Sequence, residues 1–327
     1  MKRTPLSWIA FGLVCFIWGT TYMAIAVAIR TLPDFLFPAL RFILGGLILL
    51  AICLAAGQKL PTRLKDWVNL TVIGFLMVVV GNVAVVFAER DVPSGMAALM
   101  VATAPFWMAL LESRRIDGER MNLRKIVGTI VGFGGVAILV APALTGVLSA
   151  GFLIGALVIQ IGNFAWNLGA FRSKYESPRD VSPLVAASIQ MLTGGMIAGV
   201  IGLGLGEWRR FSFTTETFLA FLYLVIFGSV VAYGAYVYAL AHLPTSIVAT
   251  HTYINPVIAV IAGRVLLDEP LGWRAVIAML VIFAGVAIVR TDRSHVAQTA
   301  TGILPPVRKS DWQREVEAPA EPESGHP

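Results

Sequence analysis

Charged residues are scarce in this sequence, and their scarcity is the first guide to its class. Asp, Glu, Lys and Arg make up 13% of the 327 residues, whereas soluble domains carry about a quarter. Hydrophobic residues reach 57%, and the mean hydropathy is +0.79. These values exclude an ordinary soluble domain and indicate a membrane protein.

Cysteine and catalytic motifs are also nearly absent. The two cysteines, Cys15 and Cys53, lie inside apolar runs, so we interpret them as packing residues without a disulfide framework. The chain contains no HExxH, CxxC, GxSxG or GxxxxGK motif. We therefore predict that it is not an enzyme and has no catalytic residues, no metal and no cofactor. The net charge of +6 comes from basic residues in short gaps between apolar runs, which favours a lipid bilayer over nucleic acid as partner.

What the chain has instead is ten long apolar runs. A span of roughly 20 residues crosses about 30 Å of hydrocarbon, and continuous runs of this kind predict helices rather than barrel strands. The predicted transmembrane helices cover residues 8–29, 36–56, 67–87, 94–112, 124–141, 149–170, 181–205, 217–239, 245–266 and 272–289.

Basic residues divide unevenly between the gaps. With the N-terminus in the cytoplasm, 18 of the 25 Lys and Arg residues fall on the cytoplasmic side and 7 on the outer side. Positive charge collects on the cytoplasmic side of membrane proteins, so we predict a multi-pass inner-membrane protein with both termini in the cytoplasm. The densest gap follows the fourth run and contains Arg114, Arg115, Arg120, Arg124 and Lys125.

The two halves of the chain repeat each other. Matches at offsets of 150 and 151 include Asp117 with Asp268, Glu119 with Glu269, Pro93 with Pro244, Pro105 with Pro256 and Asn82 with Tyr233. Five helices per copy is an odd number, so the second copy must be inverted. We predict a first five-helix repeat over 1–145, a second, inverted repeat over 146–290 and a disordered cytoplasmic tail over 291–327.

Several motifs together resemble the EamA family of the drug/metabolite transporter superfamily. They are Ile17-Trp18-Gly19-Thr20-Thr21-Tyr22, Arg41-Phe42, Val92-Pro93-Ser94-Gly95 and Asp268-Glu269-Pro270. Gly81-Asn82 and Val92-Pro93-Ser94-Gly95 are especially similar to the YedA-like branch. The resemblance implies ten helices and a central cavity lined mainly by helices 1, 3, 4, 6, 8 and 9. It also implies transport of small metabolites, often outward.

Polar and aromatic residues inside the helices are the candidates for a substrate site. The predicted binding residues are Trp18, Tyr22, Asn82, Thr103, Trp166, Tyr233 and His251. Asn82 with Tyr233, and Trp18 with Trp166, occupy equivalent repeat positions, as a cavity on the repeat axis requires. The alternative for each is a plain helix-to-helix hydrogen bond.

His251 is the strongest single candidate, because an ionisable residue deep in a membrane helix is a functional-site hypothesis by default. The alternative is a neutral imidazole bonded to a tyrosine such as Tyr253 or Tyr233. Pro105 and Pro256 interrupt matched helices, where each frees a backbone carbonyl and favours a hinge.

The predicted helices have no Asp or Glu near their centres, so a buried-carboxylate proton pump is disfavoured. Facilitated movement, or coupling through His251, suits the chain better. The substrate is expected to be neutral, zwitterionic or amphipathic. Arg41 is the one possible anion partner, and we expect it near the outer headgroups.

The sequence therefore predicts an alternating-access secondary transporter that moves small metabolites, such as amino acids or related compounds, outward across the inner membrane. A multidrug-type efflux transporter is the alternative, and a membrane-embedded enzyme or sensor is favoured less, because its chemistry requires no inverted repeat. A monomer is the expected oligomeric state.

The charge division makes a topology prediction. A single-cysteine probe at position 149 should react with a membrane-impermeant reagent added from outside, and a probe at position 65 should not, because the predicted topology places Ser149 outside and Lys65 inside. The reverse labelling pattern would rule out the topology.

Overall fold

Every regular element in the part of the chain that the structure describes is a helix. The structure, a computed structural model, describes residues 5–115, 121–144, 149–178, 180–268 and 272–290. The first half contains α1 (Pro5–Ala28), α2 (Leu36–Ala55), α3 (Leu64–Gly74), η1 (Phe75–Asn82), α4 (Val83–Ala88), α5 (Ser94–Val101), α6 (Ala104–Glu112) and α7 (Leu123–Leu144). The second half contains α8 (Ala150–Glu176), α9 (Pro183–Gly204), η2 (Glu207–Arg210), α10 (Thr215–Tyr223), η3 (Leu224–Val231), α11 (Ala232–His242), α12 (Thr245–Val248), α13 (His251–Leu266) and α14 (Trp273–Arg290).

These elements form ten membrane segments, five in each half. Among the described residues, 7 segments are long and apolar enough to cross a bilayer. The other three segments are α7, the broken pair α12–α13 and the shorter α14. Five crossings invert the second half relative to the first, so the predicted all-α membrane fold of ten helices in two inverted repeats is confirmed.

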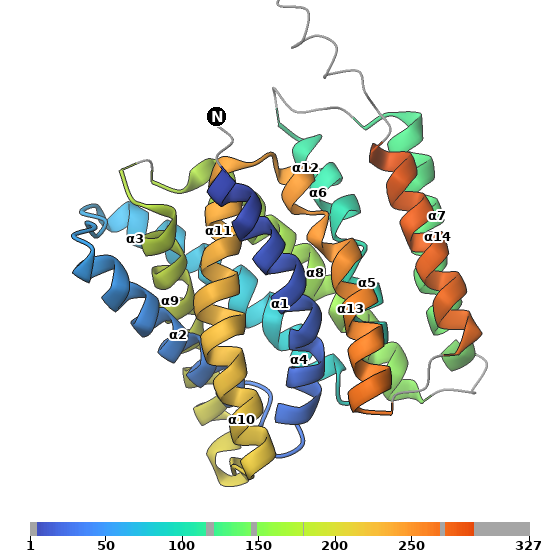
Figure 1. Cartoon of the computed structure of the whole chain (residues 1–327), viewed down its shortest axis with the longest axis horizontal. Helices are drawn as coiled ribbons and strands as arrows, with labels where there is room; N and C mark the ends of the chain where they lie inside the picture. Colours follow the sequence, from blue (N-terminus) through green and yellow to red (C-terminus); the bar gives the residue numbers. More distant parts are fainter. Residues whose placement is uncertain (1–4, 116–120, 145–148, 179, 269–271, 291–327) are drawn as a thin grey trace, which may run out of the picture. The chain divides into compact units, whose positions relative to one another are not determined.

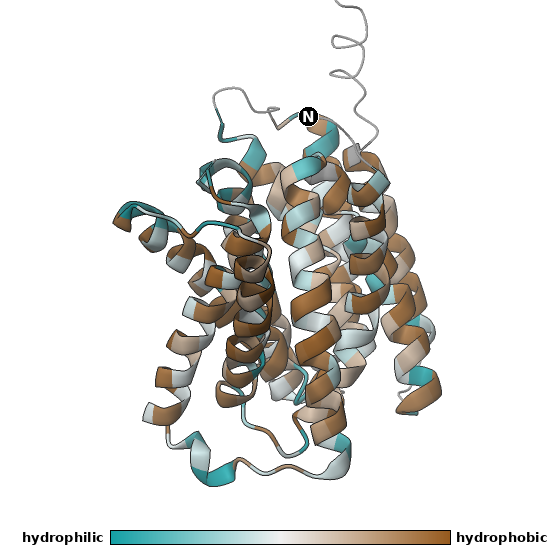
Figure 2. Cartoon of the chain, turned by 60° about the vertical axis from the view of Figure 1, so that its left-hand side comes forward, coloured by the Kyte–Doolittle hydropathy of each residue, from teal (hydrophilic) through white to brown (hydrophobic). Residues whose placement is uncertain are grey.

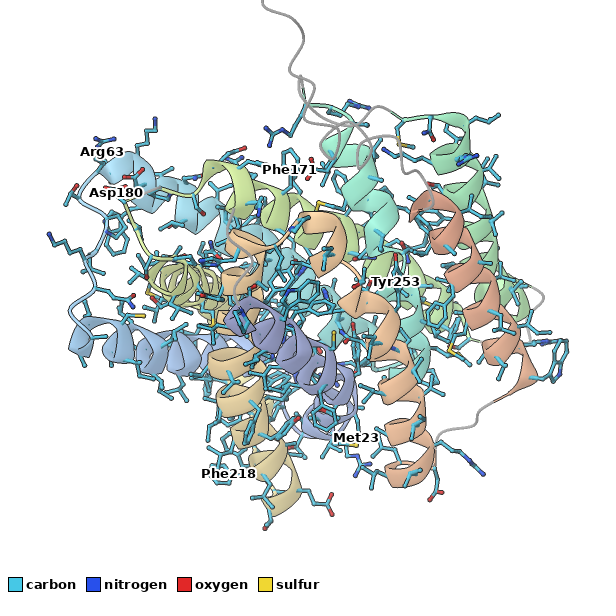
Figure 3. The ribbon with its side chains drawn as sticks, turned by 45° about the horizontal axis from the view of Figure 1, so that its top comes forward. Met23, Arg63, Phe171, Asp180, Phe218 and Tyr253 are labelled. Carbon is cyan, nitrogen blue, oxygen red and sulfur yellow. The ribbon has the colours of Figure 1, made fainter. Side chains whose placement is uncertain are left out.

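The outward faces of the helices are apolar, as contact with lipid requires. Large exposed hydrophobic side chains include Phe16, Leu157, Ile161, Val200 and Leu280. Figure 2 shows hydrophobic residues along the helices and hydrophilic ones gathered at the loops and helix ends. In Figure 3, Arg63 and Asp180 precede α3 and α9 at the opposite end from Phe218 of α10. Polar loops at the ends of apolar helices match the two surfaces of a bilayer.

Helices of one half pack on helices of the other. The most extensive contacts join α2 to α9, α1 to α13, and α8 to η1. Figure 1 shows α1 between α11 and α13, two helices of the second half. The boundary between the repeats therefore runs through the middle of the helical unit.

Polar side chains close the helix ends. The Ser149 and Ser182 hydroxyls accept the amides of Phe152 and Val185 and begin α8 and α9. The Glu207 carboxylate accepts the amides of Phe35 and Leu36 at the start of α2, where a negative charge also favours the helix dipole.

Four helix irregularities occur at related positions of the two halves. The third segment of each half contains a π-helical stretch, η1 in the first half and η3 in the second. The fourth segment of each half is broken, between α5 and α6 and between α12 and α13. The break follows 8 helical residues in α5 but only 4 in α12, so the two halves differ in backbone shape at this point.

Two helices, α7 and α14, stand at the periphery and pack through glycine. A Cβ added at Gly128 of α7 would lie 2.5 Å from the carbonyl oxygen of Gly285 on α14, and the reverse distance is also 2.5 Å. Neither helix contributes a described residue to the central cavity. Figure 1 shows α7 and α14 side by side at the edge of the bundle.

Some sequence-based expectations concern residues outside the described ranges. These are the repeat matches at Asp117, Glu119 and Glu269, the motif residue Pro270 and the tail from residue 291.

The glycine contact predicts a loss of stability in Gly285→Ala, because its methyl group would clash with backbone atoms of α7. We expect a loss of about 1–3 kcal/mol, measured by thermal unfolding of the purified protein in detergent. Gly134→Ala is the matched control on α7, where an added Cβ has no neighbour within 4 Å. Equal stability of the two variants would contradict the packing argument.

Candidate functional site

A cavity lies at the boundary between the two halves. It encloses about 900 Å³ of empty space, its open mouth included. Seven of the ten membrane segments contribute to its wall. One residue from each is Trp18, Arg41, Asn82, Val101, Trp166, Tyr233 and Asn255. Segments 1, 3, 4, 6, 8 and 9 all line the cavity, as the family resemblance implies. The second segment, α2, lines it as well.

Six of the seven predicted site residues line this one cavity. They are Trp18, Tyr22, Asn82, Trp166, Tyr233 and His251. They come from five different membrane segments, so only the fold brings them together. The Asn82 side-chain oxygen is buried and has no hydrogen-bond partner among the described residues. Their role in binding remains a prediction.

Thr103 is the exception, and its placement as a cavity residue was wrong. Its side chain is fully buried and does not line the cavity. The hydroxyl lies 2.9 Å from the Gln160 amide oxygen and accepts the Asn163 side-chain amide at 3.0 Å. Thr103 therefore supports Asn163, which does line the cavity, from behind the wall.

Aromatic rings form a connected group on the wall. The Trp18 ring centroid lies 5.5 Å from that of its repeat mate Trp166, edge to face, and 4.8 Å from that of Tyr236. The Trp166 ring also meets Tyr233 at 6.0 Å. The Trp18 indole donates to the carbonyl of Gly228 at 3.1 Å, which fixes its ring in the wall. Such contacts give a rigid, apolar surface that suits a flat or apolar part of a solute.

His251 is buried within this aromatic group. Its ring lies 5.2 Å from Trp18 and 5.4 Å from Tyr236 between centroids. Its Nδ1 is 2.7 Å from the carbonyl oxygen of Val248. A carbonyl only accepts, so Nδ1 carries a proton and Nε2 is the acceptor when the ring is neutral.

The hydrogen bond found at His251 is to this backbone carbonyl and not to Tyr233. Tyr233 instead donates its hydroxyl to the Gln190 side chain at 3.1 Å. Tyr253, labelled in Figure 3, meets the ring of Phe283 on α14 at 5.9 Å between centroids.

Pro105 and Pro256, which occupy matched positions in the two halves, have different surroundings. Pro105 has no amide hydrogen for the carbonyl of Val101 four residues earlier, and that carbonyl accepts the Asn163 side chain at 3.2 Å. Pro256 lies inside α13 beside Asn255. The Asn255 side-chain amide nitrogen donates to the backbone carbonyl oxygens of His251 and Cys15, at 2.9 Å each. The second contact ties α13 to α1.

Arg41 is the residue that sequence reasoning misplaced. It is not exposed toward the headgroups: the residue is 2% exposed and lines the cavity. Its Nε donates to the Ser229 hydroxyl of η3 at 2.9 Å. The sequence contains a signal for this role, because an arginine inside an apolar run indicates a functional site. Its place near one end of the run favoured the headgroup interpretation.

Comparison with known proteins agrees with this architecture. Residues 6–141 and 153–291 each match the EamA-like transporter family. The chain belongs to the EamA-like transporter family. It is therefore a multi-pass membrane transporter, and the predicted family is confirmed.

Relatives extend over most of the chain. The uncharacterized inner membrane transporter YedA of Escherichia coli K12 is 34% identical over 87% of this chain and 90% of its own. The uncharacterized transporter YvbV of Bacillus subtilis is 25% identical over 93% of this chain and 98% of its own. A protein crystal structure, 20% identical, superposes with a TM-score of 0.63 over 88% of this chain and 98% of that one, so the two share a fold.

The aromatic wall predicts a transport defect in Trp166→Ala. Loss of ring contacts, each worth about 0.5–1.5 kcal/mol, should lower flux by on the order of tenfold. The measurement is solute flux into proteoliposomes at matched protein content. Trp208→Ala serves as control, because Trp208 is 58% exposed in η2 and does not line the cavity. Unchanged flux in Trp166→Ala would remove the residue from the site.

Proposed function

We propose that the protein is an alternating-access secondary transporter that moves small metabolites, such as amino acids or related compounds, outward across the inner membrane. The observation that carries this proposal is the cavity at the boundary of the two repeats, which holds six residues singled out from the sequence alone. Solute sites at repeat boundaries are typical of secondary transporters. The name of the relative YedA supports the inner membrane as location.

The predicted orientation and organisation belong to the same proposal. Both termini lie in the cytoplasm, because that orientation places 18 of 25 basic residues inside. The two repeats, 1–145 and 146–290, form the cavity within a single chain, so a monomer suffices for transport.

We further propose facilitated movement as the transport mode. Among the described residues that line the cavity there is no Asp or Glu, and His251 is the only histidine. The His251 ring instead meets the rings of Trp18 and Tyr236 in T-shaped contacts. One histidine without an acidic partner makes a weak proton relay. Coupling through His251 is the second candidate.

Export can be tested by comparing metabolites in the medium of cells that produce the protein, its Trp166→Ala variant or neither. We expect one or a few small metabolites to accumulate outside only with the wild type. The same compound should leave loaded proteoliposomes down its own gradient without an imposed pH gradient. If an imposed pH gradient alone drives it uphill, the facilitated mode is wrong. Loss of that transport in His251→Gln would then support coupling through His251, and its persistence would contradict both modes. If the media of all three cultures contain the same metabolites at the same levels, the proposed export is contradicted.

A further inference from the structure

Arg41 has an incomplete set of hydrogen bonds inside the cavity. A guanidinium has five N–H donors. Its Nε reaches Ser229, but Nη1 is buried and has no partner among the described residues. Buried nitrogen donors in proteins are almost always paired, so an unpaired one on a cavity wall indicates a missing partner.

Its positive charge is also uncompensated. The ion pairs found among the described residues join Arg30 to Glu216, Arg90 to Asp34 and Arg172 to Glu176, and none includes Arg41. The described cavity wall holds no Asp or Glu. A buried, unpaired charge is costly in a membrane protein and is retained where it has a function.

The surroundings of Arg41 hold the guanidinium in place. The Phe42 ring centroid lies 4.8 Å from its central carbon, a cation–π distance. A Cβ added at Gly228 would lie 2.9 Å from Nη2, so glycine at that position leaves room for the group. Ser229, the next residue, fixes Nε. Ser229 and Phe42 thus position the guanidinium, and its Nη1 is left without a partner among the described residues.

We propose that Arg41 binds a carboxylate of the transported solute and so selects monocarboxylates with an apolar or aromatic body. This inference rests on the proposed transport function and narrows the expected class of solute to one with a carboxylate. A carboxylate suits the free edge of a single guanidinium. A phosphate carries more charge and usually meets several cationic groups, whereas no lysine is among the described lining residues. The aromatic group around Trp18 and Trp166 receives the apolar body.

The alternative for Arg41 is a purely structural link between α2 and η3 through Ser229. That role predicts altered stability but no preference among solutes. A carboxylate anchor predicts a preference that disappears with the arginine, even when the variant remains folded. The selectivity between matched ligands therefore separates the two roles.

The test uses the full-length protein in lipid nanodiscs and isothermal titration calorimetry. The probes share a phenyl ring and differ in the head group: 3-phenylpropanoate, 3-phenylpropanamide and 2-phenylethylammonium. The wild type should bind the carboxylate at least about tenfold more tightly than the amide, the ratio expected for one charge-assisted hydrogen bond. Arg41→Gln should bring the two affinities within about twofold, and Arg41→Lys should restore part of the preference.

Two controls keep the result interpretable. Ser229→Ala removes the link between α2 and η3 but leaves the cation, so it should keep most of the carboxylate preference. Arg90→Gln removes an arginine that pairs with Asp34 and does not line the cavity, and should behave as wild type.

The proposal is overturned if the wild type shows no carboxylate-dependent binding across the series. It is also overturned if folded Arg41→Gln keeps the preference. If the wild type transports the amide or the amine but shows no preference for the carboxylate, only the role of Arg41 is contradicted. The proposed transporter function would still stand.

Discussion

The need to satisfy every backbone hydrogen-bonding group away from water governs this structure. In hydrocarbon the only partners are within the protein, so the chain forms helices throughout its spans. The exceptions occur where the helices face the cavity. There the carbonyls of Val101 and Gly228 accept side chains of Asn163 and Trp18. Asn163 and Trp18, which bond the carbonyls left free by the irregular helices, are therefore also residues of the candidate site.

Hydrogen bonds and ring contacts hold the side chains of the cavity wall in place. Asn163 is held by Thr103 and by the Val101 carbonyl, and in turn accepts the Asn167 side chain at 3.0 Å. Trp18 is held by Gly228 and by the rings around it. A wall held in this way presents fixed groups to a solute, which reduces the ordering cost of binding.

Much of this architecture could be predicted from the sequence. The ten apolar runs and the positions of the gaps follow from the length of a bilayer crossing, and the contact between α7 and α14 follows from small residues at helical spacing. The cavity residues were predictable where the repeat supplied a second signal, as for Trp18 with Trp166 and Asn82 with Tyr233. Residues at equivalent repeat positions are related by one axis, so a single sequence can indicate which residues lie near each other in three dimensions.

The errors share a physical cause. Sequence position gives depth along a helix but not direction around it or the identity of a neighbour. Thr103 has the right depth but turns to Gln160 and Asn163, and His251 meets a carbonyl of its own segment rather than a tyrosine. Arg41 was placed by depth alone, although Ser229 and Gly228 on a helix almost two hundred residues away decide where it points.

The unequal breaks in the fourth segments have a consequence for the conformational cycle. The first half bends after two helical turns and the second after one, although the sequence of one half echoes the other. Related sequences thus hold two backbone shapes within the same molecule. In the proposed alternating-access cycle, exchange of these shapes between the halves would give a second state related to this one by rotation about the axis of the inverted repeats. A solute can shift the balance between two such states only by binding one of them more tightly than the other.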